Sequence, residues 1–201
     1  MKLRYSSASP YARKVTIVAH ECGLADNITL ENANVWDPAS DVVKDNPLGK
    51  VPALITDDGQ ALFDSPVICE YLDHLHDGPP LFPATGAAKW TALRRQALAD
   101  GLLDAALLVR IETAMRPQPA LWPAWIERQQ AAILRCLDAL EEEASDLVEL
   151  ASIGEISIAA ALGYLDLRKA VADWRSGRPR LTAWFATVSQ RPSMIATVPQ
   201  G

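Results

Sequence analysis

Apolar residues in the first third of the chain change between strand-like and helix-like spacing. Residues 2–6 and 28–33 are short runs that read as strands. Between them, apolar residues recur at i, i+3, i+4 and i+7 from Val15 onward, and Ser9 is a favoured residue for the helix start before them. The pattern predicts a strand at 2–6, a helix at 10–22 and a strand at 28–33.

Residues 53–63 contain two further apolar runs around an Asp-Asp-Gly turn, which predicts a β-hairpin. The helix after the hairpin is predicted to open with Ser65 as N-cap and Pro66 as first helical residue. Behind them, Ile68, Tyr71, Leu72 and Leu75 are spaced as one apolar helix face. The order strand, helix, strand, hairpin, helix predicts α/β layering over one small mixed sheet.

A proline-rich stretch at residues 77–83 separates two halves of different character. It carries three prolines and a glycine, and strand signals are absent after it. An S-x-x-E capping box opens at Ser152. We therefore predict an α/β domain at 1–77, a linker at 78–85 and an all-helical domain at 86–201. The helical patterns of that second domain cover residues 86–115, 123–145, 154–172 and 179–190.

Composition narrows the class of protein. With 201 residues, 49% hydrophobic and 22% charged, the chain has room for two small cores of ordinary globular composition. The net charge of −6 and the lack of a Lys/Arg cluster argue against nucleic-acid or anionic-membrane partners. No apolar run approaches 18 residues, and the N-terminus lacks a signal-peptide core.

The cysteines and histidines do not follow a metal or disulfide pattern. Cys22, Cys69 and Cys136 are odd in number and widely spaced, and the first two fall on apolar helix faces, so we expect buried thiols in a reducing cytoplasm. His74 and His76 are two apart on a predicted helix and do not face each other, while His20 is distant. We therefore expect no metal site.

Two motifs flank the hairpin and carry candidate chemistry. Residues 46–52 read N-P-L-G-K-V-P, and residues 64–72 read D-S-P-V-I-C-E-Y-L. The second motif ends the hairpin at a helix N-terminus, whose free N–H groups and positive dipole end suit a carboxylate. On bare statistics the Val51–Pro52 bond is trans, because only about 5–6% of X–Pro bonds are cis. In combination, the motifs resemble the glutathione-binding half of the cytosolic glutathione transferases.

This resemblance implies a thioredoxin-like first domain, a cis Val51–Pro52 bond and specific roles for the motif residues. The backbone of Val51 would bind the cysteinyl part of glutathione beside Pro52. Asp64 and Ser65 would hold the γ-glutamyl carboxylate and amine; their simpler role is helix cap and turn. Lys50 would reach the glycyl carboxylate, or else is a solvated lysine.

A serine is the candidate for activating the glutathione thiol. A free thiol has a pKa of about 8.5, so a hydrogen bond to the thiolate is needed at neutral pH. By resemblance, Ser9 stands where a glutaredoxin or an omega-like transferase carries a nucleophilic Cys. A mixed disulfide at this residue is therefore unavailable. Its simpler role is helix capping; Ser6 and Ser7 are reserve candidates, and Tyr5 is expected in the core.

The resemblance also implies a second-substrate pocket and a dimer contact. Asp100 would approach the γ-glutamyl amine of a partner subunit, or else is a surface carboxylate. The electrophile pocket would lie between the domains, near Tyr11, Leu107, Ile111 and Met115. An apolar stripe of this spacing is also typical of core, and Trp122 and Trp125 are expected to pack inside.

Together these features predict a cytoplasmic, homodimeric glutathione S-transferase with glutathione as co-substrate and no metal. Its bound thiolate would attack a small electrophile, as in detoxification, or reduce a peroxide or disulfide. One alternative is a non-catalytic regulatory or scaffold protein of the same fold, because fold alone does not fix function. Another is a glutathione-dependent thiol reductase that uses a different group.

Overall fold

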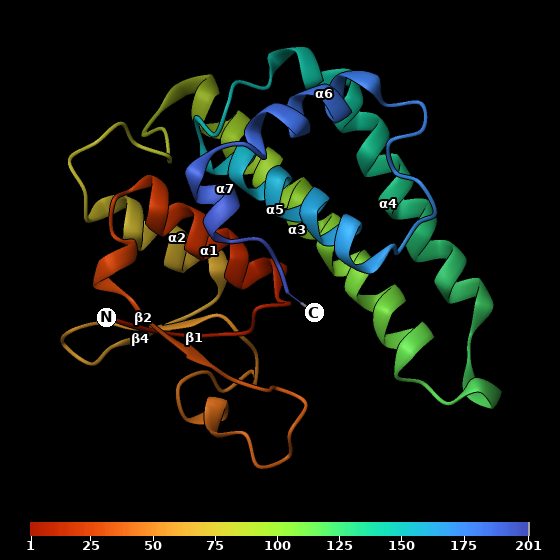
Figure 1. The fold of residues 1–201 in the computed structure, drawn as a ribbon, viewed down its shortest axis with the longest axis horizontal. Helices are drawn as coiled ribbons and strands as arrows, with labels where there is room; N and C mark the ends of the chain where they lie inside the picture. Colours follow the sequence, from red (N-terminus) through yellow and green to blue (C-terminus); the bar gives the residue numbers. More distant parts are fainter. Residues whose placement is uncertain (201) are drawn as a thin grey trace. The chain divides into compact units, whose positions relative to one another are not determined.

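The computed structural model describes residues 1–200, and its internal contacts divide it into two compact units (Figure 1). The first unit comprises residues 1–89 together with the segment from Pro192 onward, and the second comprises residues 90–191. The sequence had suggested 86–201 as one helical domain. The grouping differs at the C-terminus because the last segment packs on the first helix, as described below.

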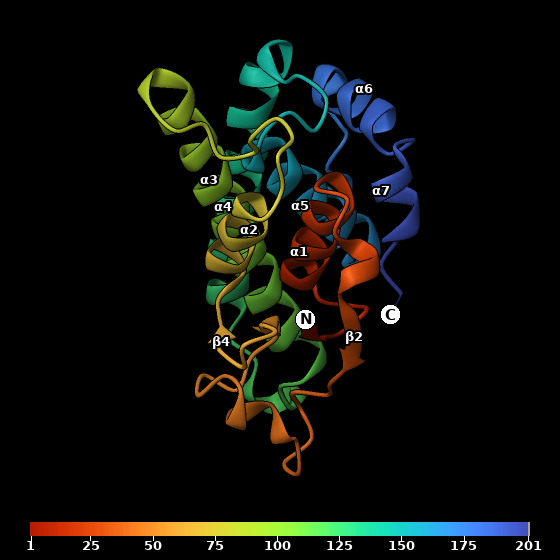
Figure 2. The same cartoon turned by 90° about the vertical axis from the view of Figure 1, so that its left-hand side faces the viewer.

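The first unit is built on a four-stranded mixed sheet. Its strands are β1 (Lys2–Tyr5), β2 (Thr29–Asn32), β3 (Ala53–Ile55) and β4 (Ala61–Leu62), in the order β2-β1-β3-β4. β1 is parallel to β2 and antiparallel to β3, which is antiparallel to β4. Helices α1 (Pro10–Glu21) and α2 (Ser65–His74) lie together on one face of this sheet (Figure 2). The predicted thioredoxin-like arrangement is confirmed.

The apolar side chains predicted to form one face of each helix are buried or half-buried, with one exception. The buried side chains of α1 and α2 include Val15, Val18, Ile68 and Leu72, and the two helices pack on each other, with α2 also contacting β3. Leu75 was expected on the same face but is 42% exposed, because α2 ends at His74 and Leu75 is its C-cap.

The second unit is all helical, as predicted. Its helices are α3 (Gly86–Ala114, whose first turn belongs to the first unit), α4 (Pro123–Glu143), α5 (Ile153–Arg168) and α6 (Pro179–Val188). Residues 153–165 of α5 are all buried, so this helix forms the centre of the unit. It stops at Arg168, before the predicted end at 172, because Lys169 takes a left-handed conformation with φ of 50°.

The capping box at the start of α5 is present and extends into a buried ion pair. The Ser152 hydroxyl accepts from the Gly154 N–H at 3.1 Å and donates to the Glu155 carboxylate. Glu155 in turn accepts from Arg95 Nη1 of α3 at 2.7 Å, with both side chains buried. These contacts fix the α5 N-terminus against α3.

One expectation for the rest of the chain was wrong, and one short helix was not predicted. Trp122 is 62% exposed and stacks on Trp125 with ring centroids 5.7 Å apart, so the pair lies on the surface of its unit rather than in the core. The short helix is α7 (Pro192–Ala196). No helix among residues 1–200 is both long and apolar enough to span a membrane.

Candidate functional site

The sheet register brings the three predicted glutathione-contacting segments to one edge. Arg4 pairs with Ala53, so the end of β1 and the loop after it lie beside the start of β3. Leu54 pairs with Leu62, so the end of β4 lies on the other side of the same β3 start. Val51–Pro52, Asp64–Ser65 and the loop leading to Ser9 therefore emerge at the same end of the sheet.

The loop that ends in Val51 is shaped by its own first residue. Asn46 is buried; its side-chain oxygen accepts from the Leu48 N–H at 3.0 Å and its side-chain amide donates to the Lys50 carbonyl at 2.8 Å. Gly49 has φ of 64°, a left-handed conformation that glycine adopts without steric cost. The N-P-L-G-K sequence thus encodes a closed turn immediately before Val51.

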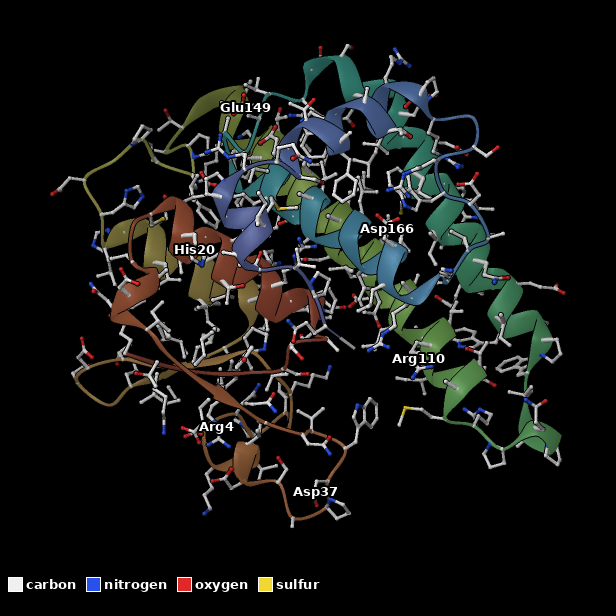
Figure 3. All side chains as sticks on the ribbon, in the orientation of Figure 1. Arg4, His20, Asp37, Arg110, Glu149 and Asp166 are labelled. Atoms are coloured by element: carbon white, nitrogen blue, oxygen red, sulfur yellow. The ribbon has the colours of Figure 1, made fainter. Side chains whose placement is uncertain are left out.

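A buried arginine fixes this loop to the sheet. Arg4 of β1, which is labelled in Figure 3, donates to Asp45 at 2.9 Å and to Asp41. Both acceptors precede the Asn46 turn. The hydrogen bond from Arg4 lowers the pKa of Asp41. Because Arg4 is buried while its partners are partly exposed, the pair connects the loop to a rigid strand. The sequence had not indicated this anchor.

The backbone at the start of β3 agrees with the resemblance rather than with bare statistics. The Val51–Pro52 bond is cis. Pro52 is buried and lacks an N–H, and Val51 is half-buried beside it. Lys50, the candidate for the glycyl carboxylate, is exposed.

The start of α2 differs in detail from the prediction. Asp64, not Ser65, is the N-cap, and its side chain makes no capping hydrogen bond. Ser65 is the first helical residue and is only 1% exposed, whereas Asp64 is exposed. The N-terminus of α2 thus presents N–H groups and a serine hydroxyl next to a free-standing carboxylate, which suits a ligand that carries both a carboxylate and an amine.

Ser9 is the N-cap of α1, which is the simpler of the two roles predicted for it. Its hydroxyl accepts from the Ala12 N–H at 3.2 Å, and its own N–H donates to the Ser6 carbonyl at 2.9 Å, closing a turn. The hydroxyl is half-buried and its hydrogen is free to donate, because the capping bond uses only an oxygen lone pair. Capping and thiolate donation are therefore compatible for Ser9.

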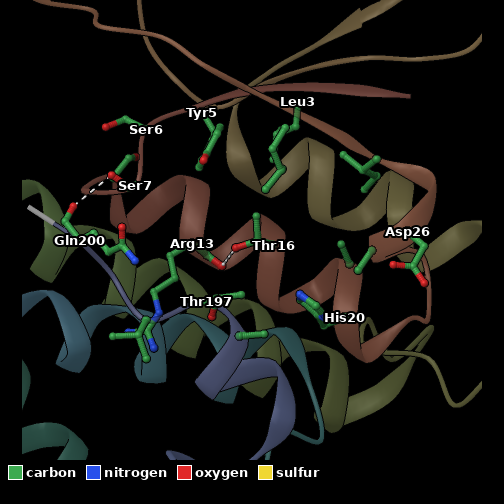
Figure 4. Close-up of a pocket in the computed structure, with 17 residues that line it drawn as sticks. Leu3, Tyr5, Ser6, Ser7, Arg13, Thr16, His20, Asp26, Thr197 and Gln200 are labelled. Carbon is green, nitrogen blue, oxygen red and sulfur yellow. Dashed lines mark hydrogen bonds between the residues drawn. The ribbon is translucent and has the colours of Figure 1, made fainter.

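A cavity of about 320 Å³ lies beside α1, between the end of β1 and the C-terminal segment (Figure 4). Tyr5, Ser6, Ser7 and Ser9 line one end of it, so Tyr5 borders a cavity and is not part of the core. The Arg13 side chain extends across it from α1 toward the C-terminal segment (Figure 4).

The remaining predicted residues are distributed over both units. Tyr11 is half-buried on α1, and Asp100 is half-buried on α3; both have interaction partners. Leu107 and Ile111 are half-buried on α3, and Met115 just beyond it is 46% exposed. The electrophile pocket and the cross-dimer contact stay predictions.

One cluster was missed by sequence reasoning. Ligand-type atoms of Cys22, Asp73 and His76 lie within 4.8 Å of one another, because packing of α1 against α2 joins residues far apart in sequence. The Asp73 oxygens accept backbone N–H groups of the 77–83 stretch, and His76 bonds to Asp73 at 3.1 Å and to the Gly78 N–H at 2.9 Å. These bonds make the cluster an anchor for the linker.

Cys22 itself is a poor nucleophile in this setting. Burial, together with the charges of Asp73 and Glu21, raises its pKa to about 12. Cys69 is fully buried, and desolvation raises the pKa of Cys136. The expectation of buried, unreactive thiols at Cys22 and Cys69 agrees with this geometry.

Family models locate this geometry within a known family. Residues 8–75 match the N-terminal domain of glutathione S-transferases, and residues 123–187 match the C-terminal domain. The chain belongs to the glutathione S-transferase family. It is 35% identical to the uncharacterized GST-like protein YibF of Escherichia coli (strain K12), over 99% of this chain and 98% of that protein.

Solved structures of similar sequence agree. A glutathione transferase family member from Pseudomonas fluorescens Pf-5, solved with bound glutathione, is 43% identical with a TM-score of 0.93, covering 100% of this chain and 99% of the other. A glutathione S-transferase from Methylobacillus flagellatus KT, also with glutathione bound, is 37% identical with a TM-score of 0.92, covering 99% of each chain. The two-domain transferase fold predicted from the motifs is thereby confirmed.

Proposed function

We propose that this protein binds glutathione at the sheet edge formed by Val51–Pro52 and Asp64–Ser65, and activates its thiol for attack on a small electrophile. The observation that carries the proposal is the register, which lines up the β3 start, the β4 end and the α1 start. Glutathione bound in structures 43% and 37% identical to this chain supports the same ligand here.

Each part of glutathione has a chemically matched group in this proposal. The Val51 main chain pairs with the cysteinyl backbone as an added strand would. The α2 N-terminus and Ser65 take the γ-glutamyl carboxylate, and Asp64 takes its amine. Lys50 approaches the glycyl carboxylate. Cys22 and Cys69 take no part in this proposal, because both are buried.

Ser9 is proposed to act on the thiol. Its hydroxyl stands at the N-terminus of α1, where the helix dipole already favours an anion. Donation of its hydrogen to the glutathione sulfur stabilises the thiolate, and each pKa unit of stabilisation corresponds to about 1.4 kcal/mol. Catalysis then leaves no covalent intermediate on the protein.

We further propose a cytoplasmic homodimer with a detoxification role. In it Asp100 of one subunit approaches the γ-glutamyl amine in the other, and Tyr11, Leu107, Ile111 and Met115 form the electrophile pocket. Analytical ultracentrifugation tests the assembly: a stable monomer at micromolar concentration contradicts it.

The experiment that tests the activity is a panel assay with reduced glutathione. An activated aryl halide, an organic hydroperoxide and a small disulfide are offered separately, and the products are resolved by mass. A thioether conjugate formed at a rate that saturates with glutathione is the expected result. Glutathione binding without turnover of any member supports the non-catalytic alternative, and oxidised glutathione from the disulfide alone supports the reductase alternative.

A further inference from the structure

The C-terminal segment from Pro192 to Gln200 is attached to the first unit although the second unit precedes it in sequence. α7 packs on α1, and the residues after it continue along the cavity beside α1 (Figure 4). The segment is therefore held by the same helix that Ser9 caps.

Two bonds join the start of the segment to α1. The Ser193 hydroxyl donates to the carboxylate of Glu21, the last residue of α1. The Arg13 guanidinium donates to the Met194 carbonyl at 3.3 Å in a buried position. The segment thus starts near the far end of α1.

Two further bonds join the end of the segment to the loop before α1. The Gln200 N–H donates to the Ser7 carbonyl at 3.2 Å, and the Ser7 hydroxyl donates to the Gln200 carbonyl at 3.1 Å (Figure 4). Ser7 thus bonds Gln200 twice, once through its main-chain carbonyl and once through its side-chain hydroxyl, and we call this pair of bonds the Ser7–Gln200 bridge. Because Ser7 is exposed, packing contributes little to holding it, and the bridge restrains it in addition to the turn that the Ser9 N–H closes.

The bridge acts on the turn that directs Ser9. Ser7 lies inside the turn closed by the Ser9 N–H and the Ser6 carbonyl, so a fixed Ser7 carbonyl restrains the backbone that leads into Ser9. A hydroxyl contributes to thiolate stabilisation only when it is held in the correct direction.

We propose that the segment 197–200 is a positioning element: by bridging Ser7 it holds the Ser9 hydroxyl toward the bound glutathione sulfur. The proposal rests on the glutathione-activating function proposed above. It assigns no contact with glutathione to the segment, so its loss is expected to alter thiol activation and leave peptide binding intact.

The test compares two substitutions at one exposed position. Gln200→Pro deletes the N–H that bonds Ser7, whereas Gln200→Ala changes only an exposed side chain and keeps both bridge bonds. A chain ending at Ala196 removes the bridge altogether. Each protein is titrated with reduced glutathione across pH while the thiolate absorbance is followed. Amide exchange over residues 6–12 is measured on the protein alone.

Gln200→Pro and the shortened chain are expected to raise the pKa of bound glutathione, so that the thiolate population at neutral pH falls about three- to tenfold. The dissociation constant measured at low pH, where the thiol is protonated, is expected to stay unchanged. Their amides over residues 6–12 are expected to exchange about fivefold faster, the ratio for one hydrogen bond of about 1 kcal/mol. Gln200→Ala should match the parent. An equal thiol pKa in all four proteins overturns the proposal, whatever their exchange rates.

The two readouts also separate this inference from the proposed function. If the parent protein does not bind glutathione, the proposed function fails, and so does the claim about the thiol. Exchange then decides alone whether the segment holds the loop. If glutathione binds and its thiol is activated equally in every variant, the function stands and the positioning role is wrong.

Discussion

The side-chain amide of Asn46 donates a 2.8 Å hydrogen bond to the main-chain carbonyl of Lys50, the residue before Val51. One buried side chain thereby closes the turn that delivers the Val51 backbone to the sheet edge. Asn46 does not need to touch glutathione for this bond to control how well glutathione binds.

Asn46→Asp is therefore expected to weaken glutathione binding. The carboxylate still accepts the Leu48 N–H but cannot donate to the Lys50 carbonyl, and the loss of one hydrogen bond costs about 0.5–1.5 kcal/mol. We expect about tenfold weaker affinity by calorimetry and a lower unfolding midpoint. Asn34→Asp is the control, because exposed Asn34 uses only its oxygen, accepting from the Trp36 N–H. Equal loss in both variants would contradict the role of Asn46.

Ser9 has two separable roles, and two substitutions distinguish them. Ser9→Ala should cost about 1 kcal/mol of stability through the lost cap, whereas Ser9→Gly should cost only a few tenths. If the hydroxyl also activates the thiol, both variants lose turnover to the same extent, with glutathione affinity little changed. Thermal unfolding and steady-state kinetics on both variants decide this. Turnover in Ser9→Gly equal to that of the parent, with chemistry rate-limiting, would remove Ser9 from the mechanism.

The approach of α5 to α3 depends on a glycine. A Cβ on Gly154 would lie 2.8 Å from Arg95 Cβ and 3.0 Å from the Ala92 carbonyl oxygen. Gly154→Ala should therefore destabilise the protein by about 1–3 kcal/mol, despite the better helix propensity of alanine. Gly101→Ala on α3 is the matched control, because its Cβ meets nothing within 4 Å and should stabilise by up to about 1 kcal/mol. Equal unfolding midpoints for Gly154→Ala and Gly101→Ala would show that no close approach at Gly154 limits the side chain.

Cys22 should resist alkylation in the folded protein. Its pKa, raised to about 12 from 9.0, leaves almost no thiolate at pH 8. The pKa of Cys22 is higher in the folded protein than in the unfolded one. The free energy of unfolding therefore keeps its full value below pH 9 and decreases as pH rises toward 12. Mass spectrometry after iodoacetamide treatment should find Cys22 modified only in denaturant. A mixed disulfide between Cys22 and glutathione in the native protein would instead support the reductase alternative.

Local sequence signals predicted most of the fold. Strands and helices follow apolar spacing, and the turn of residues 46–52 follows from Asn46 and Gly49, whose side-chain bonds and backbone freedom act within a few residues. The motifs at 46–52 and 64–72 indicated the family because each motif lies within a few consecutive residues. The cap of α2 was displaced by one residue, because both Asp64 and Ser65 are acceptable N-caps.

The features that sequence did not reveal all depend on contacts between distant residues. Arg4 meets Asp41 and Asp45 only because β1 lies beneath the loop. The Cys22 cluster needs α1 to pack on α2, and the bridge from Ser7 to Gln200 joins residues near opposite ends of the chain. Periodicity within a segment carries no information on such pairs, so only the folded structure reveals them.

The most direct test of the account is a calorimetric titration of the purified protein with reduced glutathione at neutral pH, repeated with Ser65→Ala. Ser65 is buried at the start of α2, where it is proposed to hold the γ-glutamyl group. We expect one site per chain and at least about tenfold weaker binding in Ser65→Ala, with an unchanged unfolding midpoint. No binding at millimolar glutathione, or full affinity in Ser65→Ala, would contradict it.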